Sequence, residues 1–185
     1  MFFFLFISQS LFAQLDKDYV PITYSGSVPA DFVYSPRKAI KEAIANETVL
    51  DKKSARFFYT SVYYDVQNMM TGGKVYFNDP LSNYLNEIAS QILVSKPELS
   101  GKIKIFATRS AVINAESWPN GYIFINIGEI NAMDNVHQLA FTVAHEIAHY
   151  ANKHAINSYK REKDISKQET SDVENDDGDN YRTLR

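Results

Sequence analysis

Residues 136–154 read VHQLAFTVAHEIAHYANKH, and their pattern predicts a helix. Apolar residues recur at spacings of three and four positions, which gives such a helix one broad apolar face to lie against a core. These apolar positions are Leu139, Ala140, Val143, Ile147, Ala148 and Ala151. His145 and His149 then lie one turn apart on the same helix, with Glu146 next to the first of them.

This histidine motif, HEIAH over residues 145–149, predicts a metal centre. Imidazoles four residues apart on a helix have Cβ atoms about 6 Å from each other, so both can reach one ion. Zinc is the natural ion, because neutral imidazole is a good ligand for it. Glu146 would point at a water on the ion and accept its proton. We therefore predict one zinc ion held by His145 and His149, with Glu146 as the general base of peptide-bond hydrolysis.

Two more histidines flank the motif, His137 near the start of the helix and His154 near its end. Each is expected to be a surface or supporting residue rather than a metal ligand. On a continuous helix, His154 lies about 140° around the axis from His149 because it follows five residues later. We therefore do not expect His154 to bind the same ion.

A small β-sheet is predicted before this helix. Residues 102–108 begin with alternating polar and apolar side chains, residues 111–115 form a second candidate strand, and residues 122–127 are dense in aromatic and β-branched side chains. The Pro-Asn-Gly run at 119–121 predicts the turn before the third strand. Three strands of this length would form one small sheet.

Further helices are predicted towards the N-terminus. One begins at Ser35-Pro36, where serine caps the helix and proline suits its first position, and the Asp79-Pro80 pair repeats this signal. A helix over residues 51–70 and a short strand over 74–77 lie between them. The fold class expected is α+β, with a helical N-terminal part, a small sheet with an edge strand, and the helix that carries the histidine motif.

Composition excludes several kinds of protein. The chain has 185 residues, 45% of them hydrophobic, which suits one domain with a core. Its 19 Lys and Arg against 22 Asp and Glu leave a net charge of −3, so nucleic acid is not an expected partner. The absence of cysteine excludes a thiolate nucleophile and a disulfide framework. The longest apolar run is shorter than the roughly 20 residues of a membrane helix, so no transmembrane segment is expected.

The two ends of the chain differ from the middle. Residues 1–13 are strongly apolar and resemble the signal peptide of an exported protein, periplasmic or secreted. Residues 14–34 contain scattered proline and glycine and are expected to form an extended arm. Residues 159–185 are charged and expected to be a solvated, mobile tail. Residues 35–158 would then form one metallopeptidase domain.

Three stretches together resemble family forty-eight of the metallopeptidases. They are Val-Ile-Asn-Ala at 112–115, Pro-Asn-Gly-Tyr-Ile-Phe-Ile at 119–125, and Ala-His-Glu-Ile-Ala-His at 144–149 followed by His154. The family includes prenyl-protein endopeptidases and bacterial membrane and periplasmic quality-control proteases, and the resemblance spans roughly residues 74 to 158. It implies a zincin-like fold and a zinc endopeptidase that uses His145 and His149 as ligands and Glu146 as base. The implied partner is a polypeptide substrate, membrane-associated substrates included.

The resemblance also implies a place for the substrate. In the family, the strand pair before the zinc helix forms an edge on which a substrate chain lies extended. This carries over to Asn114, Ala115 and Glu116, and an edge strand can bind a peptide through its backbone with little sequence selectivity. Glu116 stands where an apolar residue is usual.

The family's third zinc ligand is a glutamate in a Glu-x-x-Ala-Asp pattern on a later helix, and this sequence has no match to it. Three interpretations stay open, of which the first is favoured. The sequence is a fragment that stops before that helix, or it is a degenerate homologue, or a glutamate of the tail substitutes, namely Glu162, Glu169 or Glu174.

The expected function is a zinc-dependent metalloendopeptidase acting on extended or unfolded polypeptides. One alternative is an incomplete homologue or fragment that binds polypeptide without cleaving it. A further alternative is a structural domain in which the two histidines bind no metal.

Overall fold

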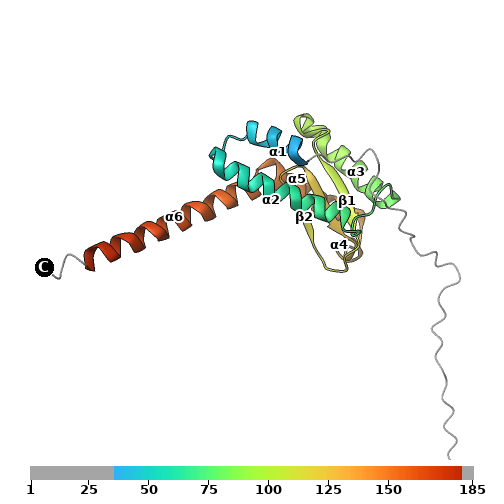
Figure 1. Ribbon diagram of the computed structural model, residues 1–185. Helices are drawn as coiled ribbons and strands as arrows, with labels where there is room; N and C mark the ends of the chain where they lie inside the picture. The colour runs from blue at the N-terminus through green and yellow to red at the C-terminus, as the bar shows by residue number, and fades with distance from the viewer. Residues whose placement is uncertain (1–35, 181–185) are drawn as a thin grey trace, which may run out of the picture.

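The computed structural model describes residues 36–180, with side chains over 37–170. The predicted signal peptide, the predicted arm and the Ser35 cap lie outside the described residues. The elements are α1 (Pro36–Ala45), α2 (Lys52–Thr71), α3 (Pro80–Ile92), β1 (Lys104–Thr108), β2 (Ala115–Ser117), β3 (Tyr122–Asn126), α4 (Ile127–Asn131), α5 (Val136–Ala151) and α6 (His154–Asn180), with two 3₁₀ turns after α3 at Leu93–Ser95 and Pro97–Leu99 (Figure 1). Helices around a small mixed sheet confirm the predicted α+β class.

The sheet has three strands in the order β1-β3-β2. Strands β1 and β3 run parallel, with Lys104 opposite Tyr122, whereas β2 is antiparallel to β3. The predicted turn at 119–121 joins β2 to β3, and Gly121 occupies its left-handed position with a φ of 86°. A Cβ on Gly121 would lie 2.0 Å from the carbonyl oxygen of Lys102, so only glycine fits there. In the strand order of the described residues, β2 is an edge strand, and it contacts α5.

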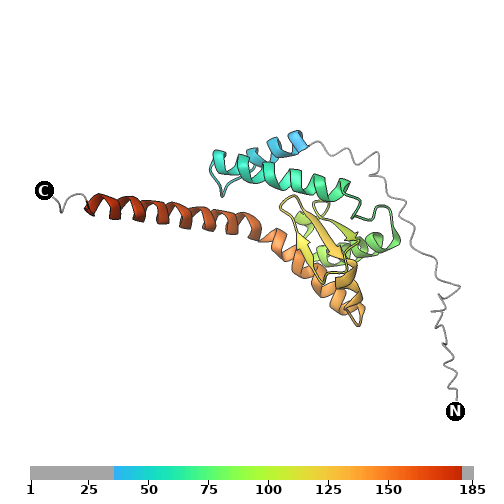
Figure 2. The same cartoon turned by 60° about the horizontal axis from the view of Figure 1, so that its bottom comes forward.

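Strands β1 and β3 are buried on both faces because the sheet lies between helices. One face contributes Ile105, Ala107, Ile123 and Ile125 to a core shared with α3 and α5. The opposite face contributes Phe106 and Phe124 to a core shared with α2. Figure 2 shows α2 on one side of the sheet and the orange α5 on the other. The nearly continuous apolar sequence of β1 and β3 follows from this burial on both sides.

The predicted strand at 74–77 is wrong, because this segment makes only an isolated antiparallel bridge between Val75 and Thr108. Its backbone bonds at two points, from Tyr76 N–H to the Ala107 carbonyl and from Arg109 N–H to the Lys74 carbonyl. Asn78 then turns with a φ of 52°, and α3 begins two residues later. The segment is buried like a strand but is too short to extend the sheet.

The predicted strand at 111–115 is also wrong, since β2 begins at Ala115 and runs to Ser117. Val112 and Ile113 are 66% and 68% exposed, so their β-branched side chains have no sheet face to cover. The Val112 carbonyl accepts a hydrogen bond from the Asn126 side chain at 3.0 Å instead of a strand partner. Strand propensity without burial did not produce a strand here.

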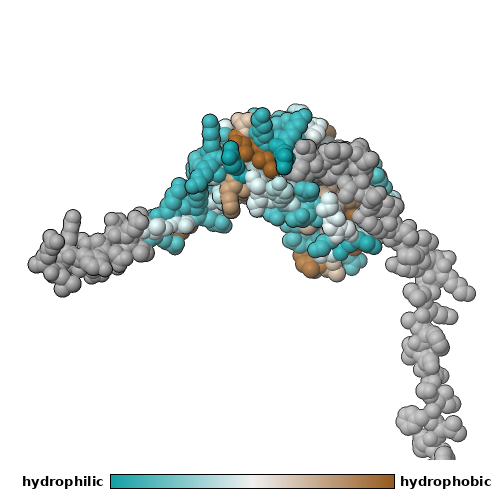
Figure 3. Space-filling model, viewed as in Figure 1, coloured by the Kyte–Doolittle hydropathy of each residue, from teal (hydrophilic) through white to brown (hydrophobic). Residues whose placement is uncertain are grey.

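The charged C-terminal stretch, expected to be a mobile tail, is helical to Asn180 in α6 (His154–Asn180). Figures 1 and 2 show α6 extending away from the other elements as one continuous helix. Figure 3 shows hydrophilic side chains at the point where it extends outward. Its first turns pack on α2, where the Tyr159 ring lies 5.0 Å from that of Phe58. Further along, Lys163 Nζ lies 3.7 Å from the Asp51 carboxylate. Within residues 36–180, no helix combines the length and apolar character that crossing a bilayer requires.

Candidate metal centre

Helix α5 positions the histidine motif, and its start is fixed by Asn135. The Asn135 side chain accepts hydrogen bonds from the backbone N–H groups of His137 and Gln138 at 3.0 and 3.2 Å. One face of the helix buries Leu139, Val143 and Ile147 in the core beneath the sheet. The motif residues therefore sit on a helix that is both capped and anchored.

Replacing Asn135 with alanine is expected to lower the free energy of unfolding by about 1 kcal/mol, because two N–H groups of α5 lose their acceptor. Urea denaturation of the metal-free chain measures the change. The control is Gln91→Ala, an exposed position on α3, where the change should stay below about 0.5 kcal/mol. Equal effects of the two substitutions would contradict the capping role.

His145, Glu146 and His149 converge in the structure. One donor atom from each lies within 4.8 Å of those of the other two, and the Nε2 atoms of the two histidines are 2.9 Å apart. His145 is exposed, His149 is partly buried and Glu146 is 7% exposed. Two converging imidazole nitrogens are a donor set that suits zinc, and the buried Glu146 carboxylate lies beside them.

The Glu146 carboxyl lies in a mixed environment. Burial raises its pKa, and nearby Glu129 adds to this effect. The imidazoles of His149 and His145 and a hydrogen bond from the Ser117 backbone act in the opposite direction without cancelling the shift. The carboxylate thus lies with the two histidines on a helix that contacts the edge strand β2.

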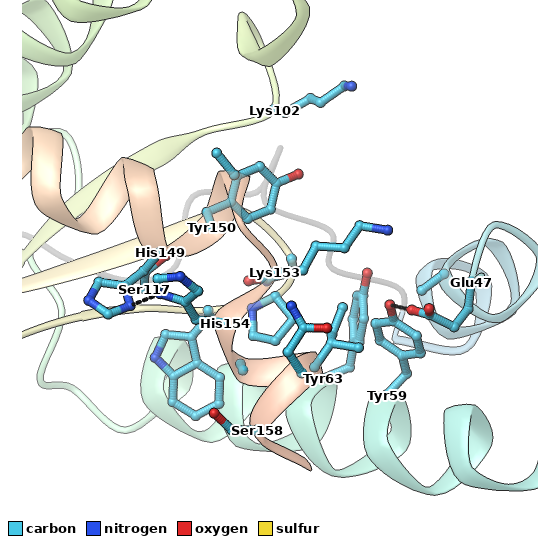
Figure 4. A pocket seen from close by; sticks show the side chains of 18 of the residues that line it. Glu47, Tyr59, Tyr63, Lys102, Ser117, His149, Tyr150, Lys153, His154 and Ser158 are labelled. Atoms are coloured by element: carbon cyan, nitrogen blue, oxygen red, sulfur yellow. Dashed lines mark hydrogen bonds between the residues drawn. The ribbon is translucent and has the colours of Figure 1, made fainter. Parts of the chain in front are cut away.

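A cavity of about 1300 Å³ opens beside this carboxylate. It lies between the α1–α2 pair on one side and β2, α5 and the start of α6 on the other (Figure 4). Its wall includes Tyr59 and Tyr63 from α2, Ala115 and Ser117 from β2, and Glu146 and His149 from α5. Tyr59 donates a hydrogen bond to Glu47, which ties α2 to the loop after α1 at the rim.

Of the three consecutive residues expected to bind substrate, only one lines the cavity. Ala115 lines the cavity beside Glu146, whereas Asn114 and Glu116 do not. The Asn114 carbonyl accepts the Asn126 N–H at 3.1 Å. Glu116 is partly buried, and burial raises its pKa, with Glu146 adding to the rise. Ser117, which sequence analysis missed, takes the cavity-facing place two residues after Ala115, and strand alternation could have identified it.

The structure places His154 against the site, which continuous helical geometry did not predict. Its Nδ1 lies 2.7 Å from Nδ1 of His149 (Figure 4). Helix α5 ends at Ala151, and the chain turns at Lys153 with a left-handed φ of 53° before α6 begins. His137, by contrast, is exposed and lines a separate shallow pocket with Phe141.

No third ligand joins the pair among the side chains that the structure describes. The only histidine and carboxylate group there with the spacing of a metal site is His145, Glu146 and His149. Glu162 and Glu169 are exposed on α6, and the side chain of Glu174 lies outside the described residues.

A helix that presents His-Glu-x-x-His beside the edge strand of a small mixed sheet defines a metallopeptidase of the zincin class. The sequence profile described as Peptidase family M48 matches residues 69–167, which include this helix and the whole sheet. The chain belongs to peptidase family M48.

Individual relatives match over shorter stretches. The chain is 43% identical to the mitochondrial metalloendopeptidase OMA1 of Homo sapiens over 51 residues, which are 28% of this chain and 10% of that protein. It is 26% identical to a protein of Vibrio cholerae named as a beta-barrel assembly-enhancing protease, over 95 residues that are 51% of this chain and 20% of that protein. The matches thus span a fifth or less of these relatives. No solved structure matches the chain significantly.

Proposed function

We propose that this chain is the zinc-binding part of a metalloendopeptidase that cleaves extended or unfolded polypeptides. The convergence of the His145 and His149 Nε2 atoms at 2.9 Å, beside the buried Glu146 carboxylate, carries the proposal. Zinc bound by the two histidines would supply a Lewis acid for the scissile carbonyl and lower the pKa of water. Membership of family M48 and the metalloendopeptidase names of its relatives support this chemistry.

Glu146 acts as the general base in this proposal. Its carboxylate accepts a proton from the attacking water and passes it to the leaving amine. The hydrogen bond from the Ser117 backbone and the packing of α5 on β2 hold the carboxylate towards the cavity. Because Glu146 is held by contacts on two elements, it needs little reorganisation during the proton transfer.

The proposed substrate is an extended polypeptide that lies along β2. Within residues 36–180 this strand pairs with β3 on one side only, so its other edge offers backbone groups to an incoming chain. Asn114, Ala115 and Glu116 border that edge, and the cavity beside Ala115 would receive substrate side chains. Backbone pairing favours unfolded chains over folded ones, since folded chains hide these groups. The apolar residues 1–13 support an exported protein, periplasmic or secreted, with membrane-associated substrates among its targets.

The test is metal content together with proteolysis by the 185-residue chain. We expect one zinc per chain by mass spectrometry and casein cleavage that stops with a chelator and returns with added zinc. His145→Ala and His149→Ala should each lose the metal, whereas the control His137→Ala, at an exposed site on the same helix, should keep it. A wild-type chain that binds no zinc would contradict the proposal.

A polypeptide-binding module is the second candidate function. It is favoured by one observation, that no third carboxylate joins the two histidines among the described side chains. Such a module would bind unfolded casein with equal affinity in the presence and absence of zinc and would release it uncleaved.

A further inference from the structure

The His149 ring has close contacts at both of its nitrogens. Its Nε2 lies 2.9 Å from Nε2 of His145, and its Nδ1 lies 2.7 Å from Nδ1 of His154. Both neighbouring rings meet it edge to face, with interplanar angles of 75° and 84°. Figure 4 shows the His149 and His154 rings joined by their hydrogen bond. His149 is thus the middle member of a row of three imidazoles.

The backbone between α5 and α6 produces this row. After Ala151, the Lys153 N–H bonds to the Tyr150 carbonyl at 3.0 Å, and Lys153 takes a left-handed φ of 53°. A non-glycine residue rarely adopts this conformation, so surrounding contacts must hold it. The Asn152 side chain donates to the Ala148 carbonyl at 2.9 Å, and the Lys153 charge interacts electrostatically with the Glu47 carboxylate. Hydrogen bonds back to α5 therefore support the turn at Lys153 that joins α5 to α6.

Proton placement on the three rings follows from the contacts. A histidine that binds a metal through Nε2 carries its remaining proton on Nδ1. For His149, that Nδ1–H faces His154 Nδ1, which must then act as acceptor and keep its own proton on Nε2. The contact with His154 is compatible with only one tautomer of each ring when His149 binds through Nε2.

We infer that His154 is a positioning residue, which fixes the tautomer and ring orientation of His149 for metal binding by accepting its Nδ1–H hydrogen bond. This inference rests on the proposed function. It differs from a third-ligand role because His154 contacts the nitrogen of His149 that faces away from His145, and His154 is not part of the cluster of donor atoms. Groups that hold the far nitrogen of a histidine ligand commonly change metal affinity 10–100-fold when removed.

The first test compares zinc dissociation constants of the 185-residue chain, measured by competition with a chromophoric chelator. His154→Ala is expected to weaken zinc binding by about 10–100-fold. His154→Asn should restore most of the affinity, because its side-chain oxygen can accept the same hydrogen bond. His137→Ala is the matched control on α5 and should bind zinc as the wild type does. Circular dichroism of the metal-free variants checks that α5 and α6 remain folded.

The second test needs no substitution. Long-range ¹H–¹⁵N NMR of the zinc-loaded wild-type chain should show the His149 proton on Nδ1 and the His154 proton on Nε2. Wild-type affinity in His154→Ala, or a His154 protonated on Nδ1, would overturn the positioning role while leaving the metal site intact. A wild-type chain without zinc would overturn the proposed function itself, so the two failures are distinguishable.

Discussion

Replacing Glu146 with glutamine is expected to lower kcat/KM for casein cleavage by about 10²–10⁴-fold, the usual contribution of a general base. Glutamine has nearly the same shape as glutamate but cannot accept the proton of the attacking water. The zinc stoichiometry should stay at the wild-type value, since the histidines, not this carboxylate, hold the ion. Cleavage of a fluorogenic peptide at saturating zinc, together with metal analysis of the same sample, measures both quantities.

The environment of Glu146 explains why no neighbour should replace it. The side chain is 7% exposed and belongs to the cluster of donor atoms formed with the two imidazoles, at the wall of the cavity. The nearest alternative carboxylate on β2, Glu116, does not line the cavity. The control is Glu87→Gln, the same substitution at an exposed glutamate on α3, which should leave cleavage unchanged. Wild-type cleavage by Glu146→Gln would eliminate the proposed base.

The elements that carry local signals were predictable from the sequence. Helix α5 has an apolar period and the histidine motif, α3 begins at the predicted Asp79-Pro80 pair, and the turn before β3 contains Gly121. Each signal reflects a constraint on neighbouring residues only. These elements could therefore be predicted without knowledge of the tertiary structure.

The elements that were missed depend on contacts between distant residues. The β-branched residues at 112–113 suggested a strand, but no face of the sheet lies over them, so β2 begins only at Ala115. The turn between α5 and α6 that brings His154 to His149 requires a left-handed conformation at Lys153. Lysine gives no sequence signal for that conformation. Helix α6 is largely polar, and its contacts with α2 include the Tyr159 ring on Phe58, which is far away in the sequence. None of these features has a local pattern.

The largest expected effect on stability is at Phe124, the middle residue of β3. Its side chain is 1% exposed and packs on Phe106, with ring centroids 5.8 Å apart, and on Trp118 at 6.4 Å. Phe124→Ala would leave a cavity between the sheet and α2 and should lower the free energy of unfolding by about 3–5 kcal/mol. Urea denaturation of the metal-free chain measures this, because bound zinc would add its own stabilisation.

The matched control is Phe57→Ala on α2, where the same atoms are removed from a side chain that is 70% exposed. The change there should be below about 0.5 kcal/mol. Strand β3 pairs with both β1 and β2. A cavity at position 124 should therefore also weaken the pairing of the edge strand β2 beside Glu146. We therefore expect Phe124→Ala to raise KM for casein even at temperatures where the chain remains folded. Equal losses of stability in the two variants would show that this face of the sheet is not a packed core.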